Sequence, residues 1–114
     1  MGRVSTVREM VAECQKEMLD DLSPARAAFL LSRMTSLLGN CSAAIRETEA
    51  VYNGVLANAL RVEKVKSRAE VYAQTTAEYW RLREAEDTFS LVEQMVMSLK
   101  VILKVAEVEM RLAR

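Results

Sequence analysis

The stretch "AEVYAQTTAEYWRLREAE", residues 69–86, contains a chain reversal that separates two long helical patterns. Thr75 and Glu78 have the spacing of a capping box, in which a hydroxyl and a carboxylate bond the free amides at a helix start. Two successive threonines also weaken any helix that reaches this point from the N-terminal side. We therefore expect one helix to end at about Ala73 and another to begin at about Thr76.

The segment after the reversal predicts a helix over about residues 76–113. Its apolar residues recur at alternating steps of three and four, which is the spacing of a coiled-coil seam. This spacing continues without an error to the end of the chain. The seam residues are Leu82, Ala85, Phe89, Val92, Val96, Leu99, Leu103, Ala106, Met110 and Ala113.

The segment before the reversal predicts one long helix, over about residues 24–73. Gly39 and Gly54 both resemble loop signals, yet the apolar spacing crosses them without losing register, whereas a loop normally resets it. A continuous helix costs about 1 kcal/mol of helix propensity per glycine. A break near Gly39 is the alternative. The seam consists of Leu31, Met34, Leu38, Cys41, Ile45, Thr48, Tyr52, Val55, Ala59 and Val62.

A shorter amphipathic pattern predicts a first helix over about residues 4–19. Ser23 and Pro24 then suit the N-cap and the first position of the long helix, because proline lacks an amide that would have no partner there. Two long helices with one repeat and a tight turn between them favour antiparallel packing. We expect an all-α single domain, residues 1–114: a coiled-coil-like helical hairpin with the short N-terminal helix bracing its open end.

The C-terminal helix carries apolar residues well outside its seam. Each large apolar side chain stabilises a fold by about 1.5–3 kcal/mol when it is buried. Because one short N-terminal helix offers little cover, we expect copies of the chain to share this surface in a homo-oligomer. The alternative is a monomeric bundle in which the rest of the chain hides it. The additional apolar residues are Leu91, Met95, Val101, Ile102, Val105, Val108 and Leu112.

The composition favours no enzyme and no cofactor. The chain has no histidine, which removes the commonest general base and zinc ligand, and it lacks glycine-rich phosphate-binding and nucleophile motifs. Cys14 and Cys41 have no ligand neighbours at metal-binding spacing, so we interpret both as buried thiols in a reducing compartment. No apolar run suits a membrane span or a signal peptide, and we expect a cytoplasmic protein.

Basic and aromatic residues gather around the chain reversal. Residues 61–83 hold six bases and three acids, a local charge of +3 in a chain whose net charge is zero. Cations beside flat rings are typical of single-stranded nucleic acid binding. The alternative is that the rings plug the bundle end and the cations form a solvated face. The candidate nucleic-acid-binding residues are Arg61, Lys64, Lys66, Arg68, Tyr72, Trp80, Arg81 and Arg83.

The quoted reversal and the closing "VEQMVMSLKVILKVAEVEMR", residues 92–111, resemble segments of small recombination mediator proteins from tailed bacteriophages. Proteins of that kind help to load a strand-exchange or annealing protein onto single-stranded DNA. The resemblance implies an oligomeric, helical, non-enzymatic DNA-binding accessory in the host cytoplasm, with a recombination protein as a partner. It points to Lys64, Lys66, Arg68, Tyr72, Arg81 and Arg83.

Two functions therefore remain open on the sequence, and a structural spacer without a ligand is a third possibility. The first is the strand-binding recombination accessory. The second is a helical adaptor or inhibitor that docks on another protein through Trp80 and the neighbouring arginines, which are residue types favoured at interface hot spots.

Overall fold

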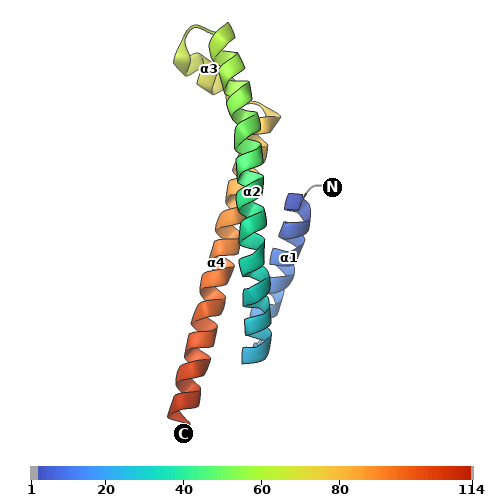
Figure 1. Ribbon diagram of the computed structural model, residues 1–114, viewed down its shortest axis with the longest axis vertical. Coiled ribbons are helices and arrows are strands. Elements are labelled where there is room, and N and C mark those ends of the chain that lie inside the picture. Colours follow the sequence, from blue (N-terminus) through green and yellow to red (C-terminus); the bar gives the residue numbers. More distant parts are fainter. Residues whose placement is uncertain (1–2, 114) are drawn as a thin grey trace.

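The computed structural model describes the backbone of residues 3–113 and the side chains of residues 7–113. All regular structure in this part of the chain is helical. The molecule is a rod of 70 × 27 × 20 Å in which α2 and α4 lie antiparallel along most of its length, with α1 beside their lower half (Figure 1). The helices are α1 (Arg3–Met18), α2 (Pro24–Val62), α3 (Lys66–Ala73) and α4 (Ala77–Leu112).

Helix α2 begins where the sequence predicts. The Ser23 hydroxyl oxygen accepts a hydrogen bond from the Arg26 amide at 3.1 Å, and Pro24 occupies the first turn. The helix then continues through Gly39 and Gly54, so the break considered near Gly39 is absent. A Cβ atom at either glycine would have no neighbour within 4 Å. Neither glycine is therefore required by close packing.

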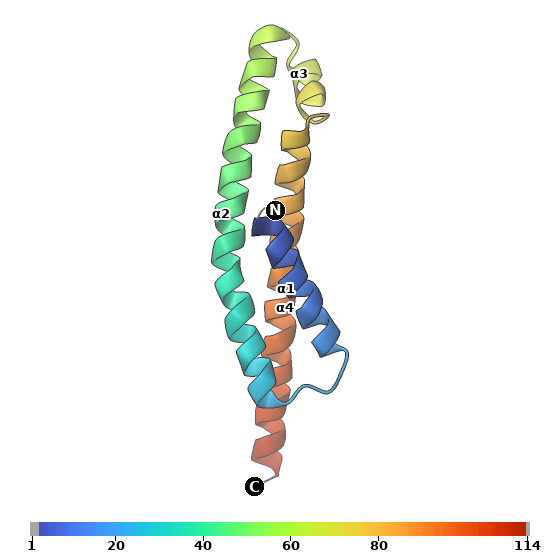
Figure 2. The same ribbon diagram turned by 90° about the vertical axis from the view of Figure 1, so that its right-hand side faces the viewer.

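The long helix predicted to reach Ala73 ends eleven residues earlier, at Val62. Glu63 and Val65 have extended backbones, and the Glu63 carboxylate accepts a hydrogen bond from the Val65 amide at 3.1 Å. The chain then folds back as α3, which packs against α2 (Figure 2). Ala69 and Ala73 of α3 are completely buried. The small methyl groups of these alanines allow α3 to approach α2 closely. A straight extension of α2 over residues 63–73 would instead have no helix to pack against.

The chain reversal lies where the sequence places it, between α3 and α4, but the capping residue differs from the expectation. Thr76, not Thr75, is the N-cap of α4, and its hydroxyl oxygen accepts from the Tyr79 amide at 3.4 Å. The Thr75 hydroxyl instead donates to the Tyr72 carbonyl at 2.6 Å. Thr75 thus completes the last turn of α3, which the sequence analysis did not separate from α2.

The base is the half of the rod in which α1, α2 and α4 pack together, formed by residues 7–41 and 89–112. Helix α1 braces the open end of the hairpin, as the sequence predicts. At the upper limit of the base, the Arg8 guanidinium donates to the Thr88 hydroxyl at 3.2 Å and lies 3.5 Å from the Glu84 carboxylate. These two contacts join α1 to the adjoining part of α4. The buried apolar core is Val7, Val11, Cys14, Ala27, Leu30, Met34, Leu37, Cys41, Val92, Val96 and Leu99.

The upper half of the rod, residues 45–88, contains α3 and the adjoining parts of α2 and α4. Only small apolar side chains are buried in this half of the rod. They belong to four alanines: Ala59, Ala69, Ala73 and Ala85. Larger residues such as Tyr52 and Leu56 are only half-buried. No helix in residues 3–113 combines the length and apolar character that crossing a bilayer requires.

Candidate nucleic-acid interface

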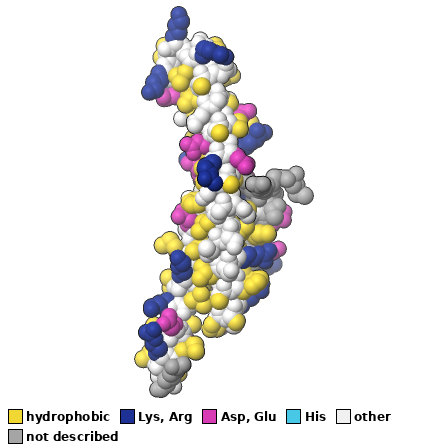
Figure 3. All heavy atoms as spheres, viewed as in Figure 1, with side chains coloured by type: hydrophobic (Ala, Val, Ile, Leu, Met, Phe, Trp, Pro, Cys, Tyr) yellow, Lys and Arg dark blue, Asp and Glu magenta, His cyan; other side chains and the backbone are white. Residues whose placement is uncertain are grey.

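The tip, residues 58–73, brings four predicted basic residues to the end of the rod, where dark blue side chains project from its upper part (Figure 3). All four are exposed. Four bases and two acids give the tip a charge of +2. Arg61 donates to the Asn58 side chain at 2.6 Å, and Lys66 lies 4.0 Å from the Glu70 carboxylate. Lys64 and Arg68 form no ion pair with any described residue, so both cations are available to a ligand.

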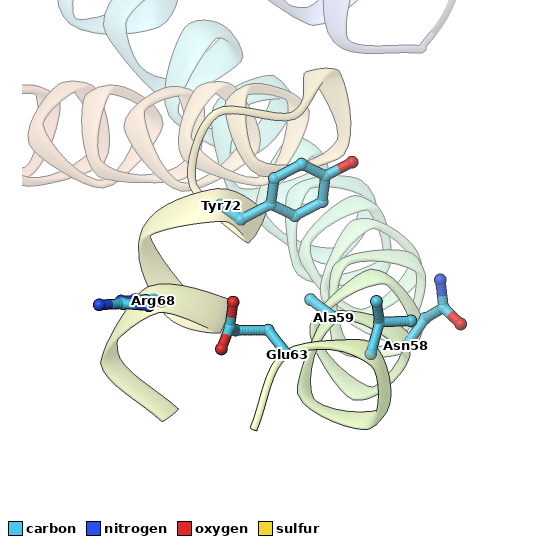
Figure 4. A pocket seen from close by; sticks show the side chains of 6 residues that line it. Asn58, Ala59, Glu63, Arg68 and Tyr72 are labelled. Atoms are coloured by element: carbon cyan, nitrogen blue, oxygen red, sulfur yellow. The ribbon is translucent and has the colours of Figure 1, made fainter. Parts of the chain in front are cut away.

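Tyr72 supplies an accessible aromatic ring on the same helix as Lys66 and Arg68. Its side chain is 64% exposed, and it lies one helical turn after Arg68 on α3. Both residues line a groove of about 290 Å³ between α3 and the last turns of α2, together with Asn58, Ala59, Val62 and Glu63 (Figure 4). They also line a second hollow of about 340 Å³, with Ser67 and Val71. Arg68 and Tyr72 are therefore the two residues common to both hollows of the tip.

The other three predicted residues lie on the first turns of α4, apart from the tip. Arg81 lines a different groove, of about 230 Å³, together with Glu47, Thr48, Val51 and Glu78. Trp80 is exposed and contacts Tyr79 at a ring-centroid distance of 5.6 Å. Tyr79 in turn contacts Tyr52 of α2 at 5.5 Å, which joins the two long helices. The eight predicted residues therefore form two sets: five at the tip, and Trp80, Arg81 and Arg83 below it.

The tip also exposes aliphatic side chains that the sequence did not mark as part of a binding site. Val62 is 78% exposed, although the expected seam placed it in the helix contact, and Val65 and Val71 are exposed as well. The missing signal is the break after Val62. A straight helix would have placed Val71 on the face opposite Val62, whereas after the fold-back of α3 both valines line hollows that Tyr72 also lines.

The apolar residues assigned to oligomerisation also form two sets. Leu91, Met95 and Ile102 pack against the core of their own chain, in which α1 contributes Val7, Val11 and Cys14. The short N-terminal helix thus covers more of α4 than the sequence analysis allowed. The remaining four are between 41% and 82% exposed: Val101, Val105, Val108 and Leu112. The surface left for a partner is therefore narrower than expected, and it lies at the end opposite the tip.

Cys14 and Cys41 are free thiols in the base core, and burial raises the pKa of both. The Glu17 carboxylate raises the pKa of Cys14 further, while Arg26 and Arg33 act in the opposite direction. Raised pKa values suppress the nucleophilic thiolate form. No three His, Cys, Asp or Glu side chains among the described residues are close enough together to hold a metal ion.

Comparison with known proteins gives no relative: no family model, curated protein or solved structure matches the chain. The assignment of a function therefore depends on two surfaces of the molecule. One is the basic and aromatic tip, and the other is the exposed apolar surface of α4 at the base.

Proposed function

We propose that this chain is a non-enzymatic accessory protein that binds single-stranded nucleic acid at its tip, in the manner of a recombination mediator. The observation that carries the proposal is the exposed Tyr72 ring, which lines the same two hollows as Arg68, together with the exposed Lys64 on the same tip. Neither cation forms an ion pair with a described residue. An exposed strand presents phosphates and unstacked bases at close intervals. The tip offers a counterpart for each.

The chemistry of the tip suits a single strand better than a duplex. Stacking of a base on an aromatic side chain contributes about 1–3 kcal/mol and is possible only where the base face is free. Arg68 and Lys64 can pair with the flanking phosphates, and Arg61 and Lys66 are close in sequence on the same part of the fold. None of these contacts reads a base edge, so we expect little sequence preference.

Self-association through the exposed apolar residues of α4 forms the second part of the proposal. Four phosphate contacts on one protomer give weak binding that falls steeply with salt. Linked copies raise the effective concentration of each additional tip once the first has bound. An oligomer whose individual tips each bind with low affinity can therefore retain a strand that a single copy would release.

Fluorescence anisotropy with a labelled oligothymidylate at two salt concentrations tests the strand-binding function. We expect the affinity to fall steeply with salt, and the Lys64→Ala/Arg68→Ala variant to bind at least tenfold more weakly. Tyr72→Leu keeps the charge but removes the stacking ring, and we expect it to weaken binding as well. Lys16→Ala/Arg46→Ala removes the same charge from exposed positions elsewhere and should bind like the parent chain. Equal losses in both double variants, or no binding by the folded parent, would reject the proposal.

A second function, docking on a protein partner, is favoured by the exposed valines of the tip. Val62, Val65 and Val71 are exposed at the tip, and two of them, Val62 and Val71, line hollows with Tyr72. Phosphates do not need this aliphatic surface. Clustered apolar residues with an arginine and a tyrosine are typical of protein interfaces. For a pure adaptor, we expect a folded sample to show no oligonucleotide binding even at low salt. The same titration therefore distinguishes the two functions.

A further inference from the structure

Four of the exposed apolar residues of α4 form a continuous stripe, which we call the α4 stripe: Val101, Val105, Val108 and Leu112. Their steps of four, three and four place them along one side of the helix, with the spacing of a coiled-coil seam. The last turns of α4 extend beyond the start of α2 (Figure 2), so the hairpin partner does not reach them. The α4 stripe thus repeats the pattern of the internal seam on a surface that the chain itself leaves open.

The two flanks of the α4 stripe carry opposite charges. At about 100° of rotation per residue, Lys100 and Lys104 lie on one flank, and neither forms an ion pair with a described residue. Arg111 lies on the same flank and is already paired with Glu107 at 2.5 Å. Glu109 lies on the other flank. An open groove of about 480 Å³ lies on this side of the stripe. Its lining includes the acidic residues Glu109, Asp20 and Asp21 together with Val101 and Val105 of the stripe.

This charge asymmetry discriminates between the two ways in which a second copy can dock. In a parallel pair of helices, unlike flanks meet, and a residue before one seam position faces the residue five positions later on the partner helix. Lys104 then faces Glu109 of the second copy, and the two-fold symmetry forms this pair twice. In an antiparallel pair, like flanks meet. Lys104 then approaches Lys104 or Arg111 of the second copy, and the contact is repulsive.

We propose that two copies of this chain associate in parallel along the α4 stripe. This inference refines the self-association in the proposed function, on which it rests. It has a consequence for the binding end, because a parallel pair carries both tips at the same end of the assembly. An antiparallel pair joined at the base would place its tips at opposite ends, separated by more than the 70 Å length of one chain.

Single-cysteine cross-linking reads the orientation directly. In a parallel pair, Val101→Cys and Leu112→Cys each bring two identical thiols together at the two-fold axis, so each variant alone forms a disulfide-linked dimer on mild oxidation. In an antiparallel pair, residue 101 of one copy faces residue 112 of the other. Two identical thiols are then about 16 Å apart along the helix axis, too far for a disulfide. Only a mixture of the two variants would then cross-link. The parent chain, whose two thiols are buried, is the control.

Charge reversal gives an independent test by sedimentation equilibrium. For the parallel pair, Lys104→Glu and Glu109→Lys should each raise the dimer dissociation constant about tenfold, because two attractive contacts become repulsive. The double variant should restore it. A tighter dimer in Lys104→Glu, cross-links only in the mixture, or a folded chain that remains monomeric at all concentrations would each overturn the parallel dimer.

These experiments use no nucleic acid, so their outcome is separate from that of the strand-binding function. A parallel dimer that binds no oligonucleotide would support this inference and reject the binding tip. A chain that binds oligonucleotide through Lys64 and Arg68 but cross-links only as the antiparallel mixture would do the reverse.

Discussion

The base and the upper half of this rod share two helices, yet they are held together differently. In the base, α1, α2 and α4 enclose large side chains such as Met34 and Leu99, which are almost completely buried. In the upper half, the buried apolar residues are alanines, and larger side chains such as Tyr52 and Tyr79 are only half-buried. Because stabilisation scales with the apolar area removed from water, the base contributes most of the free energy of unfolding. The helices of the upper half are held in place by close packing through small residues rather than by a large apolar core.

This difference suits the functions proposed for the two ends. A binding end gains from exposed valines, cations and an aromatic ring, and a large core would have buried the valines and the ring. The base supplies the stability that the tip lacks. It also exposes the α4 stripe, on which the proposed dimer depends.

The largest effect on stability should come from removing a large side chain of the base. Leu99 has no exposed surface, and we expect Leu99→Ala to lower the free energy of unfolding by about 2–5 kcal/mol. Leu56→Ala, at a half-buried position of the upper half, should cost less than half as much. Chemical denaturation measures both. Reaction of Cys14 and Cys41 with a thiol reagent should also accelerate in Leu99→Ala, since both thiols lie in the same core.

A similar loss of stability in the two variants would show that the upper half contains a core as effective as that of the base. The contrast between the two halves would then be wrong.

A smaller and more local effect should follow from enlarging an alanine of the upper half. Ala73 is completely buried between α3 and its neighbours, and we expect Ala73→Leu to destabilise that contact by about 1–3 kcal/mol. Hydrogen exchange of residues 66–73 should accelerate, while amides of the base core keep their protection. Ala57→Leu, at an exposed position of α2, is the matched control. Faster exchange throughout the base would mean that the two halves unfold as one unit.

The smallest effects should come from the two glycines of α2, one in each half. Both positions have open space for a methyl group, so Gly39→Ala and Gly54→Ala should each stabilise α2 by up to about 1 kcal/mol. We expect Gly39→Ala to raise the midpoint of global unfolding. Gly54→Ala should mainly slow exchange in the upper half. Destabilisation by either variant would indicate that the glycine serves a contact absent from this fold.

Local signals made much of the fold predictable from the sequence. The register across Gly39 and Gly54 indicates the continuity of α2, and Ser23 with Pro24 marks its start. The break after Val62 has no such signal, because it contains neither glycine nor proline and arises from the burial of Ala69 and Ala73 against α2. Predicting it requires knowledge of which surfaces meet in three dimensions.

The candidate site was predictable in part for the same reason. The cations of the tip are close together in sequence and remain close in space. The sequence also places Trp80, Arg81 and Arg83 close to these cations. In the structure, however, the three residues lie on the first turns of α4, below the tip that α3 forms with the end of α2. The side chains of Leu91, Met95 and Ile102 are partly shielded from solvent because they pack against a core to which α1 contributes. The apolar periodicity of α4 alone does not show where α1 lies on it.

Hydrogen–deuterium exchange of the full chain, with and without a single-stranded oligothymidylate, tests most directly whether the tip is the binding end. We expect added protection in residues 61–73, centred on Arg68 and Tyr72, and no strand-induced change in residues 20–40 of the base. Protection confined to the base, or no protection at strand concentrations that saturate any measured binding, would contradict the assignment of the tip as the nucleic-acid interface.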